Sequence, residues 1–96
     1  MSPKFQKDLR TVSQYKNFKK DRLAEYTKLL ANGENLPENA RDHKLSKNSP
    51  EKYKGLRNFH VAPDICVLYY MDDNMVHLVR IGKHNDLGMT ESLINS

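Results

Sequence analysis

The chain contains four histidines, and imidazole is the side chain that most readily takes up or releases a proton near neutral pH. Cleaving RNA without a metal requires a base for the 2′-hydroxyl proton, an acid for the leaving 5′-oxygen and a cation for the phosphate charge. An arginine fork matches a phosphate in two hydrogen bonds. The residues that together supply these groups are His43, His60, Asp64, Arg80 and His84.

Each of these residues also has a structural interpretation. His60 fits a half-buried histidine on a strand, His43 a loop residue, and His84 a residue that caps a strand end. We interpret the fourth histidine, His77, as structural, because alternation along its strand predicts that it lies on the face opposite Arg80.

A metal site is the third interpretation, since three histidines and a carboxylate suit zinc. These groups are scattered over three segments with no close pair of ligands, so we expect no metal and no cofactor.

The second half of the chain predicts the strands that position these groups. Residues 57–61 alternate as a strand does, 65–71 form a continuous apolar run typical of a central strand buried on both sides, and 75–81 follow a turn as its antiparallel partner. His60 should therefore lie late in its strand, on the side opposite Phe59. Arg80 should lie on the face that carries Val76 and Leu78.

The first third of the chain predicts two helices. Ser2-Pro3 suits a helix start, and Gly33 suits a helix end. The break near residues 15–18 is weakly marked, so one long bent helix is the alternative. Apolar stripes at helical spacing comprise Phe5, Leu9, Val12 and then Leu23, Tyr26, Leu30. Residues 34–54 read mostly as loop. Two helices followed by a strand meander predict an α+β fold with the helices on one face of the sheet.

Composition bounds the class of protein. With 96 residues and 11.2 kDa the chain suits a single domain, 1–96, and 38% hydrophobic with 29% charged residues indicates a folded globular protein. The net charge is +4, and residues 1–22 hold seven Lys and Arg against two Asp. This concentration predicts either attraction to a polyanion such as RNA or to an acidic partner, or simply a solvated helix face.

Location follows from what the sequence lacks. The longest apolar run, 65–71, is far shorter than a membrane span, and the first residues lack the apolar stretch of a secretory signal. The single Cys66 excludes an internal disulfide framework, and we expect it in the core. We therefore predict a cytoplasmic protein with no membrane contact.

Three blocks of sequence resemble the YafQ branch of the RelE/ParE toxin superfamily. They are Arg-Asp-His-Lys-Leu at 41–45, Tyr-Lys-Gly-Leu-Arg-Asn-Phe-His-Val-Ala-Pro-Asp at 53–64, and Val-Arg-Ile-Gly-Lys-His-Asn-Asp-Leu at 79–87, and the resemblance covers about 4–88. It implies a RelE-like fold and a toxin of a type II toxin–antitoxin module. The implied activity is a metal-independent endoribonuclease that cuts mRNA in the ribosomal A site.

The resemblance also implies partners and residue roles. The partners are a DinJ/RelB-like antitoxin, the ribosome and mRNA, with operator DNA bound only as part of the toxin–antitoxin complex. His84 matches the general acid, Asp64 or His43 the base or its orienter, His60 a residue that positions substrate, and Arg80 the contact to the scissile phosphate. The expected contacts to RNA and the ribosome are Lys4, Lys7, Arg10, Lys16, Lys19, Lys20 and Lys83.

The chain departs from the family pattern at both ends and at two positions. Ile65 and Leu87 stand where relatives often carry Trp and Phe, and the family's first strand should be missing or shortened. Residues 89–96 would form a flexible C-terminal extension. Two other functions stay open: a ParE-like toxin of the same fold that binds DNA gyrase, and a non-catalytic RNA-binding module.

Overall fold

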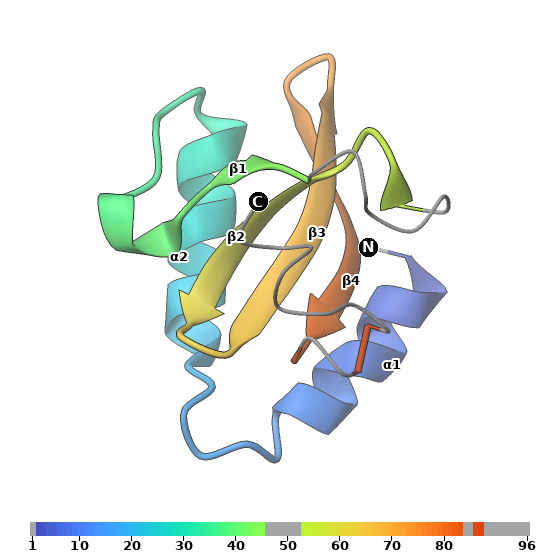
Figure 1. Cartoon of the computed structure of the whole chain (residues 1–96). Coiled ribbons are helices and arrows are strands. Elements are labelled where there is room, and N and C mark those ends of the chain that lie inside the picture. Colours follow the sequence, from blue (N-terminus) through green and yellow to red (C-terminus); the bar gives the residue numbers. More distant parts are fainter. Residues whose placement is uncertain (1, 46–52, 84–85, 88–96) are drawn as a thin grey trace.

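The fold is two helices and a four-stranded antiparallel sheet, in a computed structural model that describes residues 2–45, 53–83 and 86–87 (Figure 1). The strand order is β1-β2-β3-β4. The elements are α1 (Pro3–Val12), α2 (Lys20–Ala31), the short 3₁₀ helix η1 (Glu38–Ala40), β1 (His43–Lys44), β2 (Arg57–Ala62), β3 (Ile65–Asp72) and β4 (Met75–Gly82). The predicted α+β class is confirmed, and the RelE-like description fits it. None of the described helices is long and apolar enough to cross a membrane.

The first helix begins, and the second helix ends, at the predicted signals. The Ser2 hydroxyl oxygen accepts a hydrogen bond from the Phe5 N–H at 3.1 Å and so caps α1, and Pro3 occupies the first turn. The chain leaves α2 through Gly33, whose φ of +75° favours glycine. Residues 13–19 separate the helices, so the alternative of one long bent helix is wrong.

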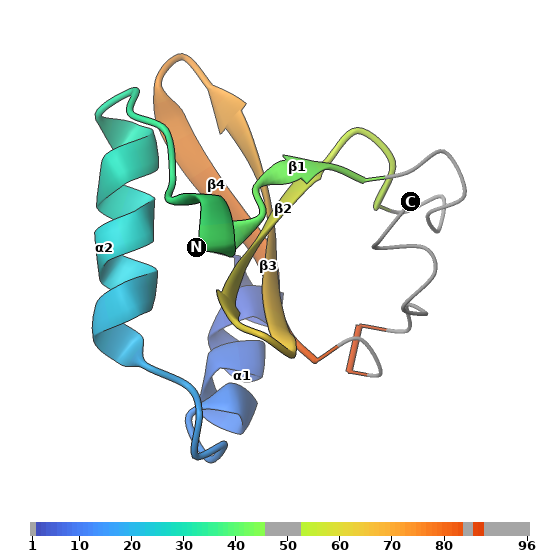
Figure 2. The ribbon, with the colours of Figure 1, turned by 60° about the vertical axis from the view of Figure 1, so that its left-hand side comes forward.

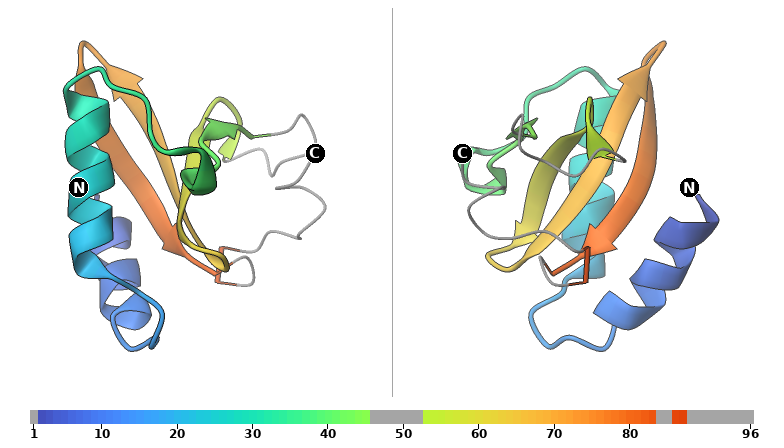
Figure 3. Two further views of the ribbon diagram at one scale, coloured as in Figure 1. Left: turned by 90° about the vertical axis from the view of Figure 1, so that its left-hand side faces the viewer. Right: turned by 45° about the vertical axis from the view of Figure 1, so that its right-hand side comes forward.

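Both helices pack on one face of the sheet, as predicted (Figures 2 and 3). The core between them centres on the fully buried Phe59, whose ring meets Tyr26 of α2 and Tyr69 of β3 edge to face, with centroids 5.9 and 5.4 Å away. The apolar stripes of the helices add Phe5, Val12, Leu23 and Leu30, and the strands add Val61, Ile65, Val67, Leu78 and Ile81. Burial of these apolar side chains stabilises the packing of both helices on this face of the sheet.

The opposite face, here called the distal face, carries the polar residues of interest. It consists of the side chains of His43, Asn58, His60, Cys66, Leu68, His77 and Arg80. A second, smaller core covers part of it, where Tyr53 and Leu87 bury Cys66 and Leu68. Because both faces are covered at its centre, β3 is buried as far as Tyr69. Tyr70 and Met71 are exposed, which corrects the prediction that the whole run is buried.

Two further expectations about the strands need comment. Residues 43–44 form the two-residue strand β1 within a stretch predicted as loop, because two residues are too short to show alternation. At the other end, α1 follows Ser2 directly. Within the described residues no strand precedes it, in agreement with the expected loss or shortening of the first strand.

A β-bulge in β4 corrects the predicted position of Arg80. Leu68 pairs with Arg80, whereas Tyr69 pairs with Leu78, so one extra residue, Val79, lies in β4 between the two pairs. The extra residue shifts the alternation by one. Arg80 therefore lies on the distal face with His77, and not on the helix face with Leu78 as strict alternation predicted.

Arg57 lies on the helix face, in phase with Phe59. Its Nε donates at 3.3 Å both to the Asp42 carboxylate and to the Tyr69 hydroxyl, and that hydroxyl donates to Asp42 at 2.6 Å. Burial, and then the bond to Asp42, raise the pKa of Tyr69 to about 12. The group is a structural tie between β1, β2 and β3.

Candidate active site on the distal face

The register of the strands arranges the distal side chains in two rows across the sheet. One row runs His43, Asn58, Leu68, Arg80, and the next runs His60, Cys66, Gly82. Neighbouring strands lie roughly 4.8 Å apart, so His43 and Arg80 are about 14 Å apart at the backbone. His43 and His60 are diagonal neighbours on adjacent strands, where side chains can touch. The sheet therefore brings the two histidines together and leaves Arg80 near the far edge.

The hydrogen bond of His43 fixes its tautomer. Its Nδ1 lies 2.6 Å from the carbonyl oxygen of Arg41. A carbonyl oxygen only accepts hydrogen bonds, so Nδ1 carries the proton and the lone pair of the neutral ring is on Nε2. His43 is half-buried at the edge of the sheet. This arrangement suits a base that takes a proton from a group approaching Nε2.

His60 is far more enclosed than the sequence suggested. Its side chain is only 4% exposed, and Asn58, two residues before it on the same face, is fully buried. Among the described residues the Asn58 amide has no hydrogen-bond partner for its nitrogen or its oxygen. The strand thus holds two polar side chains beneath the surface, where they are costly to fold and rigidly placed.

Asp64 lies in the turn between β2 and β3 at the end of the site. Its carboxylate accepts a hydrogen bond of 2.5 Å from the Asn17 amide, and its other oxygen lies 3.6 Å from the Lys83 ammonium. Lys83 also sits 4.2 Å from the centre of the Tyr15 ring. Contacts from the α1–α2 connection and from the end of β4 therefore hold Asp64 in place while leaving it about half exposed.

Asp86 completes this end of the molecule. One of its carboxylate oxygens accepts from the Tyr15 hydroxyl at 2.9 Å and from the Lys83 N–H at 3.0 Å. The bond to Asp86 raises the pKa of Tyr15. A side chain at Gly82 would collide with Asp86, since its β-carbon would lie 2.9 Å from the Asp86 Cβ. Gly82 thus lets the chain after β4 fold back against the strand.

Arg80 is held by a carboxylate. Its Nε and Nη2 donate to the two oxygens of Asp8 on α1 at 2.5 and 3.0 Å, and its Nη1 donates to the Tyr53 hydroxyl at 3.0 Å. The bond to Asp8 raises the pKa of Arg80, so the guanidinium is charged at every physiological pH. Among the described residues these bonds use three of its five N–H groups, and two remain for a phosphate.

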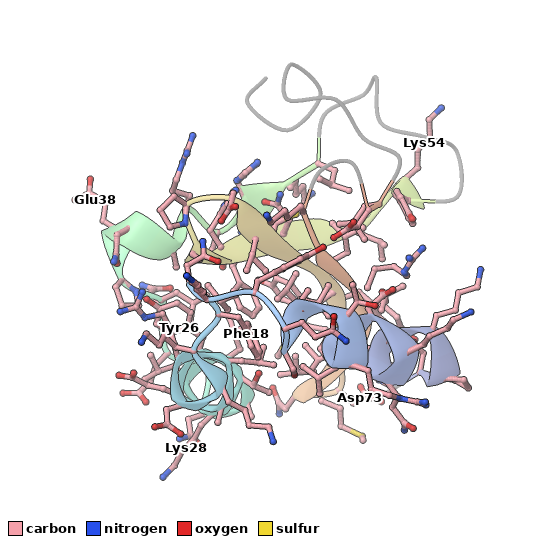
Figure 4. The ribbon with its side chains drawn as sticks, turned by 90° about the horizontal axis from the view of Figure 1, so that it is seen from below. Phe18, Tyr26, Lys28, Glu38, Lys54 and Asp73 are labelled. Carbon is pink, nitrogen blue, oxygen red and sulfur yellow. The ribbon has the colours of Figure 1, made fainter. Side chains whose placement is uncertain are left out.

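A small cavity opens beside the histidines at the outer edge of β2. This β2-edge cavity, of about 330 Å³, is lined by Arg22 and Tyr26 of α2, by Asn39 and Arg41, and by residues 60–63. It exists because β1 pairs only with Arg57 and Asn58, which leaves the rest of that edge without a strand in the described part of the chain. Figure 2 shows the segment with η1 returning from α2 toward β1, and Figure 4 shows Tyr26 pointing from α2 toward the sheet.

The cations expected to contact RNA lie on α1, on the α1–α2 connection, at the first residue of α2 and after β4. All of them except Lys83 are exposed, and Lys83 is partly exposed beside Asp64. Lys4, Lys7 and Arg10 follow one another at three-residue spacing and therefore share one side of α1. Since Asn17 contacts Asp64, the connection that carries Lys16 and Lys19 reaches the Asp64 end of the site.

Two predicted features cannot be placed. His84 and the extension 89–96 lie outside the described residues. Within the described part of the chain no three His, Cys, Asp or Glu side chains gather in a way that could hold a metal ion. Ile65 and Leu87, the positions where the chain departs from the family that it resembles, are both buried in the two cores, so neither side chain can stack on a base.

Cys66 is predicted to be chemically inert although it pairs with His60 across the sheet. Burial raises its pKa from 9.0 to about 12, which lowers the thiolate fraction at pH 8 roughly 1,000-fold relative to an ordinary thiol. We expect no detectable alkylation by iodoacetamide at pH 8 over the time in which the urea-unfolded chain reacts completely. Mass spectrometry measures the alkylated fraction of the native and of the urea-unfolded protein. Rapid labelling of the native protein would contradict the buried position.

The same shift predicts a loss of stability in alkali. The unfolded chain releases the Cys66 proton near pH 9 while the folded chain keeps it up to about 12, so the unfolding free energy falls as pH rises through this window and is unaffected below it. Chemical denaturation at pH 8 and pH 10.5 measures the fall. The Cys66→Ala variant, although less stable at both pH values, should show a smaller difference between them.

Sequence reasoning missed four residues of the site. Asp8 and Tyr53 hold Arg80, Asn17 holds Asp64, and Asn58 lies buried between His43 and Leu68. Only Asn58 left a signal in the sequence, as a polar residue in phase with His60. The others act across long separations in the chain, 72 residues for Asp8 and Arg80 and 47 for Asn17 and Asp64.

Comparison with known proteins identifies relatives of the same size. No curated protein sequence matches the chain. Among solved structures, a copper-bound mutant toxin from Helicobacter pylori is 29% identical, covering 90% of this chain and 92% of its own with a TM-score of 0.77. YafQ from Escherichia coli BL21(DE3) is 29% identical, covering 90% and 91%, with a TM-score of 0.74.

The E. coli DinJ-YafQ toxin–antitoxin complex gives a similar match, at 29% identity, 90% coverage of both chains and a TM-score of 0.72. The sequence profile of one family matches residues 1–89, which is almost the whole chain, and that family is described as the bacterial toxin of type II toxin-antitoxin system, YafQ. With this match over almost the whole chain and the fold in agreement, the chain belongs to the YafQ family of type II toxins.

Proposed function

We propose that the protein is a ribosome-dependent endoribonuclease that cleaves mRNA in the A site and so inhibits translation. The observation that carries the proposal is the pair of histidines on adjacent strands of the distal face, His43 with its lone pair fixed on Nε2 and His60 beside it. Proton transfer by imidazoles is what cleavage by the neighbouring 2′-hydroxyl requires, and it needs no metal or other cofactor.

The proposed roles combine the positions of the described groups with the resemblance to the family, which alone assigns a role to His84. His43 or Asp64 takes or orients the 2′-hydroxyl proton, His60 positions the substrate, and His84 protonates the leaving 5′-oxygen. The oxygen of the 2′-hydroxyl forms a bond to phosphorus as the bond to the 5′-oxygen breaks, which leaves a 2′,3′-cyclic phosphate and a 5′-hydroxyl. About 14 Å of sheet separates the backbones of His43 and Arg80, whereas the 2′-hydroxyl and the scissile phosphate belong to one linkage, so the two side chains must extend toward each other across the sheet to act on it.

Arg80 would contact the phosphate through its two remaining N–H groups. Asp8 neutralises much of its charge, so its attraction for a distant phosphate is weak, while its position is well fixed. We assign Arg80 to orienting the scissile phosphate at short range. The exposed cations of α1 and of the α1–α2 connection would supply the long-range attraction to RNA, which salt should weaken steeply.

A type II toxin works with an antitoxin, and we propose one similar to DinJ or RelB for this chain, because the relative in the solved complex is bound to DinJ. Operator DNA would be bound only by the toxin–antitoxin complex. The sites of action proposed here, ribosome and mRNA, lie in the cytoplasm, which is the location we propose for the protein.

The test uses purified ribosomes with a defined mRNA in the A site. The wild-type protein should cut this mRNA at one position and should leave the same mRNA intact without ribosomes. The new 5′ end should carry a hydroxyl, detected because ligation succeeds only after kinase treatment. A single 2′-deoxy substitution before the cut should abolish cleavage, and 1,10-phenanthroline, which strips transition metals and leaves the Mg²⁺ of the ribosome, should not.

His84→Ala tests the assigned acid in the same assay and should remove cleavage. Cleavage that survives the 2′-deoxy substitution would overturn the mechanism. Absence of cleavage by an active wild-type preparation that arrests growth would overturn the nuclease assignment, and a gyrase supercoiling assay would then test the gyrase-binding alternative.

A further inference from the structure

We propose that the β2-edge cavity binds a backbone phosphate of the mRNA next to the scissile one. The inference rests on the proposed nuclease function and deepens it, because it says where the RNA chain leaves the histidines. It follows from the charge of the cavity, its size and its direct connection to the site.

The lining of the cavity is cationic. Arg22 and Arg41 both line it, and none of its described lining residues is a carboxylate. Arg22 is exposed, and within the described part of the chain it makes no ion pair. It lies in the first turn of α2, where the helix dipole adds a field that favours an anion. Two guanidinium forks around one space match the oxygens of a phosphate group.

The wall of the cavity is physically continuous with the proposed site. His60 lines the cavity, and on the distal face it lies in the row next to that of His43. The carbonyl of Arg41 accepts a hydrogen bond from the Nδ1–H of His43. The residue that contributes a guanidinium to the cavity therefore also fixes the tautomer of the proposed base. An RNA strand held at His43 and His60 can therefore continue over the end of β2 into the cavity without crossing the helices.

Arg41 has a backbone conformation that residues other than glycine rarely adopt. Its φ is +54°, in the left-handed region, which is strained for a residue with a side chain. The conformation ends η1 and turns the chain into β1. Arg41 thereby supplies both a cation to the cavity and the carbonyl that accepts a hydrogen bond from His43 Nδ1.

The observations favour RNA over an acidic segment of the antitoxin. The volume of about 330 Å³ is at the small end of ligand pockets, roughly 300–1,000 Å³, and suits one nucleotide unit. Two arginines offer forks for a phosphate, and the apolar wall of Tyr26, Val61, Ala62 and Pro63 can contact the sugar or base of the same nucleotide. An antitoxin contact at this place is therefore an outcome that the test must separate.

The test measures affinity apart from chemistry, by binding of the full-length protein to ribosomes that carry a non-cleavable mRNA with a 2′-deoxy nucleotide at the cut. Arg22→Ala should raise Kd about tenfold, the usual loss for one charge-assisted contact. Arg22→Lys, which keeps the charge and loses the fork, should give an intermediate value. Lys28→Ala is the matched control, because it removes one exposed cation from the same helix on the side that points away from the sheet (Figure 4).

A scan of single methylphosphonate linkages then locates the phosphate. One neutral linkage close to the cut should weaken binding of the wild-type protein about tenfold and leave the affinity of Arg22→Ala unchanged, because that variant has already lost the contact. Lys28→Ala should respond to every linkage as the wild type does. Antitoxin affinity should be equal for all of these proteins.

Three results would overturn the inference. Arg22→Ala could bind the programmed ribosome as the wild type does. It could bind more weakly without coupling to any mRNA linkage, which would place a ribosomal phosphate in the cavity instead. It could lose antitoxin affinity alone, which would assign the cavity to the antitoxin. The proposed nuclease function fails separately, when the wild-type protein does not cleave a ribosome-bound mRNA at all.

Discussion

The Asp64→Asn variant is expected to cleave ribosome-bound mRNA about 100- to 10,000-fold more slowly than the wild type, the usual contribution of a group that accepts or orients a proton. The replacement has nearly the same shape, and its amide oxygen can still accept the hydrogen bond from Asn17. What it loses is the negative charge, and with it the ability to accept a proton. The rate constant at saturating protein, measured in a single turnover, reports this loss.

Folding should hardly change in this variant. The pair between Asp64 and Lys83 joins two side chains that are both over 40% exposed, and such pairs contribute at most about 1 kcal/mol. Asp73→Asn is the matched control. It makes the same chemical change in the β3–β4 turn, at a φ of +49° that Asn tolerates equally well. An Asp64→Asn rate within twofold of the control would remove Asp64 from the mechanism.

The Asp8→Ala variant is expected to lose about 3 kcal/mol of stability, because it leaves the partly buried Arg80 guanidinium without its carboxylate. The same carboxylate accepts the N–H of Ile81 at 3.2 Å, and that backbone group is at the outer edge of β4. For a domain of this size the loss corresponds to a fall in Tm of roughly 10–20 °C, measured by circular dichroism.

Glu25→Ala controls for the loss of an acid from a helix. Glu25 is exposed on α2, and no ion pair involves it within the described residues, so its Tm should change by a few degrees at most. Equal Tm values for the two variants would show that the pair of Asp8 and Arg80 does not secure α1 to the sheet.

The sequence predicted the elements of this fold better than their pairing. Ser2, Pro3 and Gly33 bounded the helices because capping depends on neighbouring residues. The face of Arg80 was wrong because a bulge at Val79 depends on how β4 meets β3, which no pattern within β4 records. The strand β1 was missed because two residues carry no periodicity.

In the candidate site, too, the sequence predicted residue types but not the contacts between distant segments. The residue types of His43, His60 and Asp64 indicated proton transfer, and the structure places the two histidines on neighbouring strands. The tautomer of His43 and the carboxylate that holds Arg80 depend on contacts made only after folding. The prediction that these residues are catalytic still stands as a prediction, and the Asp64 and His84 variants test it.

The bond between Asp8 and Arg80 also bears on the synthesis of the protein. At about 5–20 residues per second, the 72 residues between them take roughly 4–14 s to translate, and during that time α1 has no strand to dock against. A nascent chain interrupted before β4 lacks both this docking strand and Arg80. Prematurely terminated fragments of the toxin should therefore be unfolded and harmless to the cell, and the antitoxin has that interval to be present before the first complete toxin appears.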